Sequence, residues 1–329
     1  MTAAKIGIVG AGAWGTALAQ VLSEEQNHLL LWAREPDVVE QINTHHENKT
    51  FLANHALRQN IVATSDMDDL ASCEAILLVT PAQHLRASLK ALPNTNFPLI
   101  LCSKGIEANS QMLMSDLAKE LRPDNPLAVL SGPTFADEVA KGLPTALTLA
   151  CETERLWDRL KPLIAKPSFR PYYSNDIIGA EIGGAVKNVL AIGCGVVEGA
   201  GLGQNARASL IGRGFAEMLR YGTSRGARTE TLSGLCGLGD LVLTCSSTSS
   251  RNFSLGKGLG EGQSAASLTS NRSTVAEGAH TAPVLQADAK ERGVDMPIVD
   301  AVCGLLAGKT DPKSVVDQLM NRPLVSERR

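Results

Sequence analysis

Lys187 and Asn188 are the residues of this sequence whose types and position most clearly suggest catalysis. They lie in the middle of an apolar segment, 177–198, that is expected to form a buried helix. An ammonium group is expensive to bury unless it has partners or a lowered pKa. Gly183 and Gly184 precede the lysine on the same helix face and leave room for a ligand or a close backbone. We therefore predict that Lys187 is a general base, the alternative being a lysine whose amine reaches solvent.

A second polar group follows in the C-terminal half. The carboxylate of Asp240, which follows a glycine-rich segment, could orient or charge-balance a catalytic lysine. Ser250, Arg251 and Asn252 combine a hydroxyl, a guanidinium and a carboxamide at an expected helix start. Because the free backbone N–H groups of a helix start bind anions, these three residues predict a phosphate site. For the serines that precede Ser250, a flexible polar loop is the alternative.

Further polar residues follow expected β-strands in the N-terminal half. Lys104 follows one strand, and Gly132 and Thr134 follow another. In open α/β sheets, ligands bind beyond the carboxyl ends of the strands. We therefore expect Lys104 to point a cation at the place where cofactor and substrate meet, although away from such an edge it would be an ordinary surface lysine. Gly132 with Pro133 is also expected to begin a helix.

The motif Gly-x-Gly-x-x-Gly at Gly10, Gly12 and Gly15 directly follows an apolar strand and opens a helix. The first glycine permits a tight turn, the second lets the backbone approach a pyrophosphate, and the third lets helix and strand pack closely. The helix N-terminus attracts the phosphates. In this context the motif predicts a dinucleotide site rather than a plain glycine-rich turn.

The residues after the second expected strand bear on the choice of cofactor. An NAD-preferring site usually places an acidic residue there to bind the ribose hydroxyls. Arg34 lies near that position and favours the 2′-phosphate of NADP(H), with an ordinary loop arginine as the alternative. Glu35 is adjacent, and a shift of one residue would favour NAD(H) instead. Both cofactors therefore stay open.

These residues need elements that bring the strand ends together. Short apolar runs that alternate with helical patterns are expected to be strands buried on both faces, at 5–9, 29–32, 75–79, 99–102, 127–130 and 146–150. The alternation predicts a parallel, doubly wound, Rossmann-type α/β sheet. We expect this dinucleotide-binding domain to span residues 1–176.

The pattern changes near Ser174, after which strand-like runs are scarce. Expected helices are 177–198, 204–220, 283–292, 297–306 and 312–320, and a proline begins each of the last three. We therefore expect residues 177–329 to form a mostly α-helical domain that carries substrate and catalytic residues. A homodimer that forms through this helical domain is also expected.

Composition sets limits on the protein class. The 329 residues are 44% hydrophobic and 20% charged, with a net charge of -3, which gives no basic field for nucleic acid. The seven cysteines include no C-x-x-C pair and are expected to be buried free thiols in a reducing compartment. We expect no signal peptide and no membrane span, and therefore a cytoplasmic protein.

With these motifs, the sequence resembles the bacterial NAD(P)-dependent glycerol-3-phosphate dehydrogenases over nearly its whole length. The glycine motif is shared with many enzymes, but the Lys-Asn helix and the Ser-Arg-Asn segment together are specific. The segments that carry the resemblance are 10–19, 103–106, 131–136 with 138–139, 183–192, 205–207 with 213–214, 244–245 with 250–252, and 275–278.

The resemblance implies interconversion of sn-glycerol 3-phosphate and dihydroxyacetone phosphate, by hydride transfer with NADP(H) or NAD(H), to supply glycerol 3-phosphate for phospholipid synthesis. Lys187 would be the proton acceptor, assisted by Lys104 and Asp240. The small phosphorylated substrate would contact Lys104, Gly132, Thr134, Lys187, Asn188, Asp240, Ser250, Arg251 and Asn252. With the glycine motif, the cofactor contacts would be Gly10, Gly12, Ala13, Trp14, Gly15, Arg34, Lys104, Ala136, Arg251, Val275 and Glu277.

Three other functions are alternatives to this assignment. A 3-hydroxyacid dehydrogenase or a ketopantoate reductase shares the architecture but binds a carboxylate at the Arg251 position. A dinucleotide-sensing protein without turnover would need the glycine motif but not Lys187. A metal enzyme is disfavoured because His45, His46 and His55 lack ligand spacing and are expected in loops, so no metal is predicted.

Overall fold

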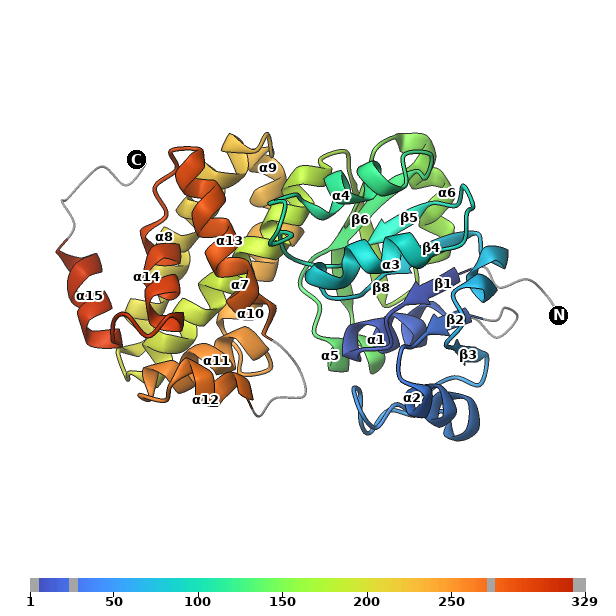
Figure 1. Cartoon of the computed structure of the whole chain (residues 1–329), viewed down its shortest axis with the longest axis horizontal. Coiled ribbons are helices and arrows are strands. Elements are labelled where there is room, and N and C mark those ends of the chain that lie inside the picture. Colours follow the sequence, from blue (N-terminus) through green and yellow to red (C-terminus); the bar gives the residue numbers. More distant parts are fainter. Residues whose placement is uncertain (1–5, 24–28, 271–275, 322–329) are drawn as a thin grey trace.

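The protein consists of a sheet lobe and a helical lobe that lie side by side (Figure 1). The computed structural model describes residues 6–23, 29–270 and 276–321. The sheet lobe is built from the N-terminal half, and the helical lobe begins with one long helix, α7 (Ile177–Gly199). The predicted class, a Rossmann-type α/β sheet plus a mostly helical C-terminal part, is confirmed.

One sheet of eight strands, in the order β3-β2-β1-β4-β5-β6-β7-β8, forms the centre of the first lobe. Its strands are β1 (Ile6–Val9), β2 (Leu29–Trp32), β3 (Ile61–Thr64), β4 (Ala75–Leu78), β5 (Leu99–Leu101), β6 (Leu127–Ser131), β7 (Thr145–Cys151) and β8 (Phe169–Ser174). The first six strands are parallel, so their carboxyl ends share one edge. The expectation of a wholly parallel sheet was wrong, because β7 pairs with β6 in the antiparallel direction and β8 follows β7.

Two of the strands, β3 and β8, were not predicted from the sequence. Each lies at an edge of the sheet. The apolar run of β3 is only three residues long, from Ile61 to Ala63. In β8, Arg170 and Pro171 interrupt the pattern. An edge strand tolerates proline because one side of its backbone needs no ladder partner.

Successive strand residues point to opposite faces of the sheet, and both faces are apolar here. Helices therefore cover both faces. Ile8 packs on the face covered by α1 and α6, whereas Val9 packs on the face covered by α3, α4 and the start of α7. The helical elements of this lobe are α1 (Ala13–Leu22), α2 (Pro36–Glu40), η1 (Gln41–His45), η2 (Asp68–Ser72), η3 (Ala82–His84), α3 (Leu85–Ala91), α4 (Met114–Leu121), α5 (Ala136–Ala140) and α6 (Glu154–Ile164).

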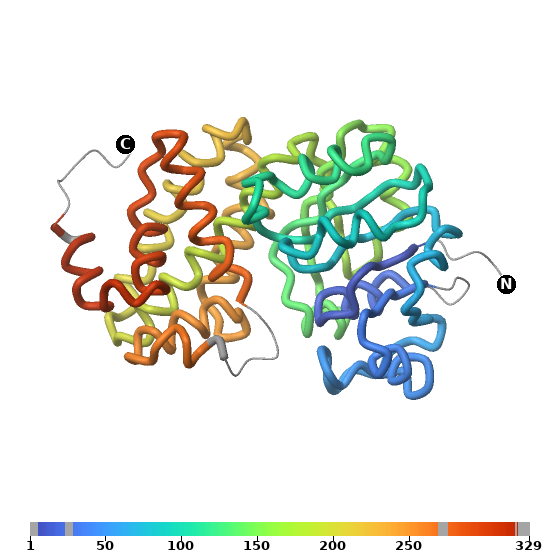
Figure 2. The backbone as a smooth tube through the Cα atoms, viewed as in Figure 1, coloured from blue at the N-terminus to red at the C-terminus, as the bar shows by residue number. Residues whose placement is uncertain are grey.

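The helical lobe packs around α7, whose central part is buried on every side. Figure 2 shows α7 running from the junction into the middle of the other helices. These are α8 (Gly203–Ser224), α9 (Thr229–Leu232), η4 (Leu235–Gly239), α10 (Asp240–Cys245), α11 (Arg251–Gly260), α12 (Ala265–Ser270), α13 (Glu277–Glu291), α14 (Pro297–Leu306) and α15 (Pro312–Met320). The start predicted for α13 was wrong: Pro283 lies inside the helix, which begins at Glu277.

Helix α7 is long and apolar enough to cross a membrane, which corrects the expectation that no such segment exists in the chain. However, 94% of its most apolar window is buried inside the fold. A helix that is hydrophobic all round is also what the centre of a globular core requires. No clear membrane span is therefore found among the described residues.

Glycines allow α7 and α11 to pack at backbone distance. A Cβ atom at Gly195 would lie 2.0 Å from the carbonyl oxygen of Phe253, and one at Gly256 would lie 1.9 Å from that of Ile192. No side chain fits at such distances. The close approach fixes α11 beside α7, the helix that carries Lys187.

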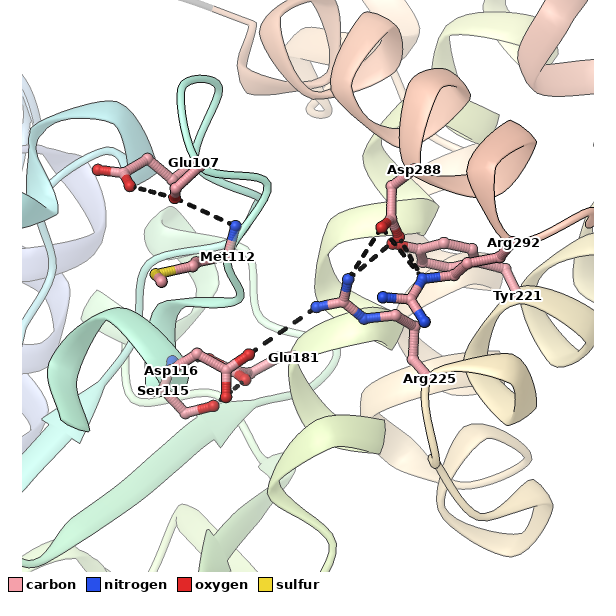
Figure 3. A network of polar contacts seen from close by, with 10 residues as sticks. Glu107, Met112, Ser115, Asp116, Glu181, Tyr221, Arg225, Asp288 and Arg292 are labelled. Carbon is pink, nitrogen blue, oxygen red and sulfur yellow. Dashed lines mark hydrogen bonds and ion pairs between the residues drawn. The ribbon is translucent and has the colours of Figure 1, made fainter. Parts of the chain in front are cut away.

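Polar contacts join the two lobes next to α7 (Figure 3). The backbone N–H and the hydroxyl of Ser115 on α4 donate to the carboxylate of Glu181 on α7, at 2.7 and 2.6 Å. Arg225, just after α8, lies 3.9 Å from Asp116 and also binds Asp288 at 3.1 Å. These contacts hold α4 of the sheet lobe against the first turns of α7.

Candidate active site

Lys187 lies at the centre of a buried polar cluster between the two lobes. Its residue is 6% exposed, and its Nζ atom donates to Asp240 Oδ1 at 2.7 Å and to Thr244 Oγ1 at 2.9 Å. Asp240 and Thr244 are four residues apart on α10, and therefore lie on the same helix face. Asp240 therefore pairs with Lys187, as expected. Thr244 was not singled out from the sequence, although its spacing of four residues from Asp240 indicates that the two share a helix face.

Lys104 reaches the same carboxylate from the sheet lobe. It lies after the carboxyl end of β5, and its Nζ donates to Asp240 Oδ2 at 2.8 Å. A longer contact of 3.5 Å joins Nζ to the carbonyl oxygen of Gly132. The carboxylate of Asp240, which is 1% exposed, is thus shared by two ammonium groups.

The electrostatics of the cluster separate the two lysines. Burial and the nearby charge of Lys104 lower the pKa of Lys187 to about 8, although Asp240 opposes this shift. Burial would also lower the pKa of Lys104, but its ion pair with Asp240 raises it above the usual value. Two ammonium groups hold the pKa of Asp240 below its usual range despite its burial. Lys187 is therefore the group that can lose a proton near neutral pH.

The two glycines before Lys187 serve close packing rather than open space. A Cβ atom at Gly183 would lie 2.3 Å from the carbonyl oxygen of Cys236 in η4, the π-helix that leads directly into Asp240. A Cβ atom at Gly184 would lie 3.2 Å from Ser131 Oγ and 3.3 Å from Lys104 Cγ. The expected close backbone approach is present at Gly183, whereas at Gly184 side chains occupy the space.

The predicted phosphate segment does begin a helix. Ser250 caps α11, and its hydroxyl accepts the backbone N–H of Phe253 at 3.2 Å. Arg251 is the first residue of the helix and is exposed. The guanidinium and the helix N-terminus can therefore both bind a phosphate group.

Asn188 and Asn252 are joined in one chain of hydrogen bonds. Asn252 Nδ2 donates to Asn188 Oδ1 at 3.0 Å, and Asn252 Oδ1 accepts the backbone N–H of Gly278 at 2.9 Å. The chain links α7, α11 and the start of α13, where Glu277 lies. Burial raises the pKa of Glu277, against the effect of the nearby Arg251 charge.

Gly132 and Thr134 follow β6 at the edge that carries Lys104. Gly132 has a φ of 156°, and a Cβ atom there would lie 2.8 Å from that of Leu147, so the position needs glycine. The helix predicted at Gly132 begins only at Ala136, because the glycine backbone is not helical. Thr134 Oγ1 donates to the Gly132 carbonyl oxygen at 3.2 Å.

The turn after β1 fits a dinucleotide pyrophosphate. Gly10 has a φ of 114°, and a Cβ atom at Gly15 would lie 1.8 Å from the Gly10 carbonyl oxygen. A Cβ atom at Gly12 would have no neighbour within 4 Å, so this glycine leaves open space above the N-terminus of α1. Ala13 and Trp14 are the first residues of α1.

Asn48, which the sequence analysis did not single out, supports this turn. It is fully buried, and its Nδ2 donates to the Ala11 carbonyl oxygen at 2.9 Å and to Thr16 Oγ1 at 2.8 Å. Its Oδ1 accepts the backbone N–H of Phe51 at 3.1 Å. Asn48 lies 37 residues from Ala11 in the chain, and no local pattern links the two positions.

The other expected cofactor residues that the structure describes come from both lobes. Arg34 follows β2, is paired with Glu35 at 2.7 Å, and its side chain is 76% exposed. Ala136 begins α5, which packs against α1. Glu277 and Arg251 come from the helical lobe, and Val275 lies outside the described residues. The pairing of Arg34 with Glu35 leaves the choice between NADP(H) and NAD(H) open.

In the described part of the chain, no group of three or more His, Cys, Asp or Glu residues could hold a metal ion. The placement of all three histidines in loops was wrong for His45, which ends η1, while His55 Nε2 contacts Asp137 Oδ1 at 2.9 Å. All seven cysteines are free, and all but Cys303 are buried.

Comparison with known proteins places the chain in a family. Residues 5–157 match the N-terminal model of NAD-dependent glycerol-3-phosphate dehydrogenase, and residues 176–317 match its C-terminal model. A protein of Erythrobacter litoralis named glycerol-3-phosphate dehydrogenase [NAD(P)+] is 62% identical over 98% of both chains. The chain belongs to the NAD-dependent glycerol-3-phosphate dehydrogenase family. The resemblance inferred from the motifs is thereby confirmed.

Other relatives agree with this assignment. A Novosphingobium aromaticivorans protein of the same name is 61% identical over 98% of both chains. The crystal structure of a glycerol-3-phosphate dehydrogenase from Coxiella burnetii superimposes with a TM-score of 0.92 at 36% identity, covering 97% of this chain and 99% of that one. As a family member, the chain is an NAD(P)-dependent oxidoreductase. Two ketopantoate reductase structures, at 15% identity, share the fold alone.

Proposed function

We propose that the protein interconverts sn-glycerol 3-phosphate and dihydroxyacetone phosphate, with Lys187 as the group that accepts and returns the hydroxyl proton. The observation that carries the proposal is a single buried amine with a pKa lowered to about 8, at the junction of a dinucleotide-type sheet edge and a helical lobe. The two relatives above 60% identity, whose names specify this substrate, support the choice of reaction.

The proton chemistry follows from the contacts of Lys187. When bound, the nicotinamide ring of NADP(H) or NAD(H) accepts or supplies the hydride at substrate C2. A neutral Lys187 takes the proton from the substrate hydroxyl during oxidation. In the reverse direction its ammonium group polarises the ketone oxygen and returns the proton. Asp240 and Thr244 hold the Nζ atom in place throughout.

Lys104 serves as a second cation near the reacting oxygen. Because its pKa is raised by Asp240, it stays charged while Lys187 titrates. Its charge favours the neutral form of Lys187 and attracts an anionic substrate to the junction. We assign Lys104 contacts to both substrate and cofactor, and Asp240 the role of fixing both lysines.

The substrate phosphate would bind at the N-terminus of α11. Ser250, Arg251 and Asn252 present a capped helix start, an exposed guanidinium and a carboxamide already oriented by Asn188. A phosphate fixed there holds the three-carbon chain at a set distance from Lys187. Gly132 and Thr134 would contact the substrate from the sheet lobe.

The cofactor would extend along the carboxyl edge of the sheet. The pyrophosphate would lie over Gly10, Gly12 and Gly15, at the N-terminus of α1. Further contacts are assigned to Ala13, Trp14, Arg34, Lys104, Ala136, Arg251, Val275 and Glu277. NADPH and NADH are both proposed as cofactors.

The same proposal extends to the cell. A cytoplasmic enzyme with this reaction supplies glycerol 3-phosphate for phospholipid synthesis. We also propose that residues 1–176 form the dinucleotide-binding domain and residues 177–329 the catalytic domain. The working form would be a homodimer joined through the helical domain.

The test is reduction of dihydroxyacetone phosphate with NADPH and NADH, compared with a panel of 2- and 3-keto acids. Activity on keto acids alone would refute the assignment. In a Lys187→Ala variant, turnover should fall by about a thousandfold, the typical contribution of a general acid–base group. Binding of NADPH should stay within about twofold because no cofactor contact is lost. Lys90→Ala, at an exposed position of α3, is the matched control and should keep full activity.

A further inference from the structure

Ser131 carries a buried hydroxyl group that the fold itself does not use. The residue is 4% exposed, and its Oγ atom has no hydrogen-bond partner among the described residues. A buried polar atom without a partner costs free energy and calls for a functional reason. The other buried serines near the site have partners: Ser103 Oγ donates to the Thr80 carbonyl oxygen, and Ser250 Oγ caps α11.

The position of Ser131 places this hydroxyl beside Lys104. Ser131 is the last residue of β6, and its neighbour Gly132 already offers a carbonyl oxygen to Lys104 Nζ. A Cβ atom at Gly184 would lie 3.2 Å from Ser131 Oγ, 3.3 Å from Lys104 Cγ and 3.4 Å from Lys104 Cδ. The hydroxyl and the lysine stem thus converge on the same glycine of α7.

The ammonium group of Lys104 has an N–H donor for which the hydroxyl of Ser131 could be the acceptor. An ammonium group has three N–H donors. In the described part of the chain, Lys104 Nζ has two acceptors, Asp240 Oδ2 at 2.8 Å and the Gly132 carbonyl oxygen at the long distance of 3.5 Å. Asp240 meanwhile also binds Lys187, the proposed proton acceptor.

We infer that Ser131 is a positioning residue for Lys104: when substrate binds, its hydroxyl accepts a hydrogen bond from Lys104 Nζ in place of the long contact to the Gly132 carbonyl oxygen, while the ion pair with Asp240 is kept. The inference rests on the proposed function, in which Lys104 contacts the substrate. Without the hydroxyl, the ammonium group would have one short contact, to Asp240 at 2.8 Å, and one long contact, to the Gly132 carbonyl oxygen at 3.5 Å. With Ser131, the ammonium group stays anchored to the sheet edge while one donor faces the substrate.

The experiment is a double-mutant cycle of Ser131→Ala and Lys104→Ala. The measured quantity is the dissociation constant of dihydroxyacetone phosphate from the enzyme with NADP⁺ bound, determined by calorimetry so that no turnover is needed. Ser131→Ala should weaken binding by about tenfold in the wild-type background, as expected for a hydrogen bond to a charged group. In the Lys104→Ala background it should have less than about a twofold effect. Equal effects in both backgrounds would overturn the inference.

Kinetics and stability separate this role from a structural one. Ser131→Ala should raise the KM for dihydroxyacetone phosphate with a much smaller change in kcat, and Ser131→Cys, which keeps the shape but accepts hydrogen bonds poorly, should fall between alanine and serine. The Tm of the ligand-free Ser131→Ala protein should stay unchanged or rise, because an unpartnered hydroxyl is removed. Ser115→Ala is the matched control, and it should lower the Tm because its hydroxyl donates to Glu181.

The outcomes distinguish the two proposals. If the wild-type protein neither binds nor reduces dihydroxyacetone phosphate, the proposed function fails. If the wild-type protein does both and Ser131→Ala matches it in KM and binding, only the role of Ser131 fails. A Tm loss in Ser131→Ala as large as that in Ser115→Ala would also contradict this role, because it would show that the hydroxyl stabilises the fold.

Discussion

At the scale of single residues, the chemistry depends on how the carboxylate of Asp240 is shared by two lysines. Lys104 and Lys187 bind different oxygens of that carboxylate, and both ammonium groups are largely buried. Their distances to Asp240 are similar, at 2.8 and 2.7 Å, but their proton affinities differ, because the pKa of Lys187 is lowered and that of Lys104 is raised. The proposed division of roles, with Lys187 as proton acceptor and Lys104 as fixed cation, rests on this difference.

The pH dependence of the reaction should report Lys187. Oxidation of glycerol 3-phosphate needs the neutral amine, so its single-turnover rate should rise as the pH rises through about 8. Reduction of dihydroxyacetone phosphate needs the ammonium form, so its rate should fall over the same range. In Asp240→Asn, loss of the carboxylate should lower the pKa of Lys187 and move both midpoints to lower pH by about one unit or more. Midpoints that stay in place or move upward would contradict this electrostatic account.

A second residue-scale prediction concerns Asn48. Asn48→Ala removes the two hydrogen bonds that hold the glycine turn, to the Ala11 carbonyl oxygen and to Thr16 Oγ1, so NADPH should bind about tenfold more weakly in fluorescence titrations. Asn43 is a matched control, because it forms two hydrogen bonds with the backbone of Ala63 in β3, away from the turn. Asn43→Ala should lose stability while binding NADPH normally. Equal cofactor affinities in the two variants would refute the assigned role of Asn48.

At the scale of elements, the site depends on how closely helices approach α7. Glycines of α7 and α11 meet carbonyl oxygens of the opposite helix, and Gly183 of α7 does the same with η4. These contacts bring the N-terminus of α11 and the carboxylate at α10 to the same helix, α7. A shift of α10 by the width of a methyl group would separate Lys187 from Asp240 and Thr244, and the same shift of α11 would separate Asn252 from Asn188.

Alanine substitutions should therefore have opposite effects at different helical glycines. Gly256→Ala would place a Cβ atom 1.9 Å from the Ile192 carbonyl oxygen, and should lower the free energy of unfolding by about 3 kcal/mol or more. Gly212→Ala, on the exposed side of α8 with no neighbour within 4 Å, should raise it by about 0.5–1 kcal/mol. Urea denaturation measures both. A neutral Gly256→Ala would mean that the two helices can separate at little cost.

At the scale of the whole molecule, the active site is completed by contacts between lobes. Lys104 comes from the sheet lobe, whereas Asp240 and Lys187 come from the helical lobe. The lobes are also joined through α4, where Glu181 supplies the acceptors for the N–H and hydroxyl of Ser115 (Figure 3). Loosening this contact would change the relative position of the two lysines.

The buried and the exposed contacts between lobes should differ in strength. Glu181→Ala leaves the N–H of Ser115 without its acceptor and should lower the free energy of unfolding by about 1–3 kcal/mol. Asp116→Asn removes an ion pair with Arg225 that is 3.9 Å long and whose carboxylate side chain is 54% exposed. Its effect should stay below about 0.5 kcal/mol, because surface ion pairs contribute little. Equal losses in urea denaturation would contradict this ranking.

The sequence by itself determined the elements whose signals are local. The glycine turn, the central strands, the buried helix around Lys187 and the start of α11 each follow from a pattern within one short segment. The edge strands β3 and β8 and the antiparallel direction of β7 were missed because strand order and direction depend on distant partners. The start of α13 was missed because packing extends that helix past a proline.

Only the tertiary structure decided which side chains meet. Asn48 lies far in the chain from the turn that it supports, and Lys104 and Asp240 are 136 residues apart. The unpartnered hydroxyl of Ser131 is visible only once α7 and Lys104 are packed against it. Residue type and spacing fix what a group can do, but its partners, and hence its burial and pKa, arise from contacts between segments that share no local pattern.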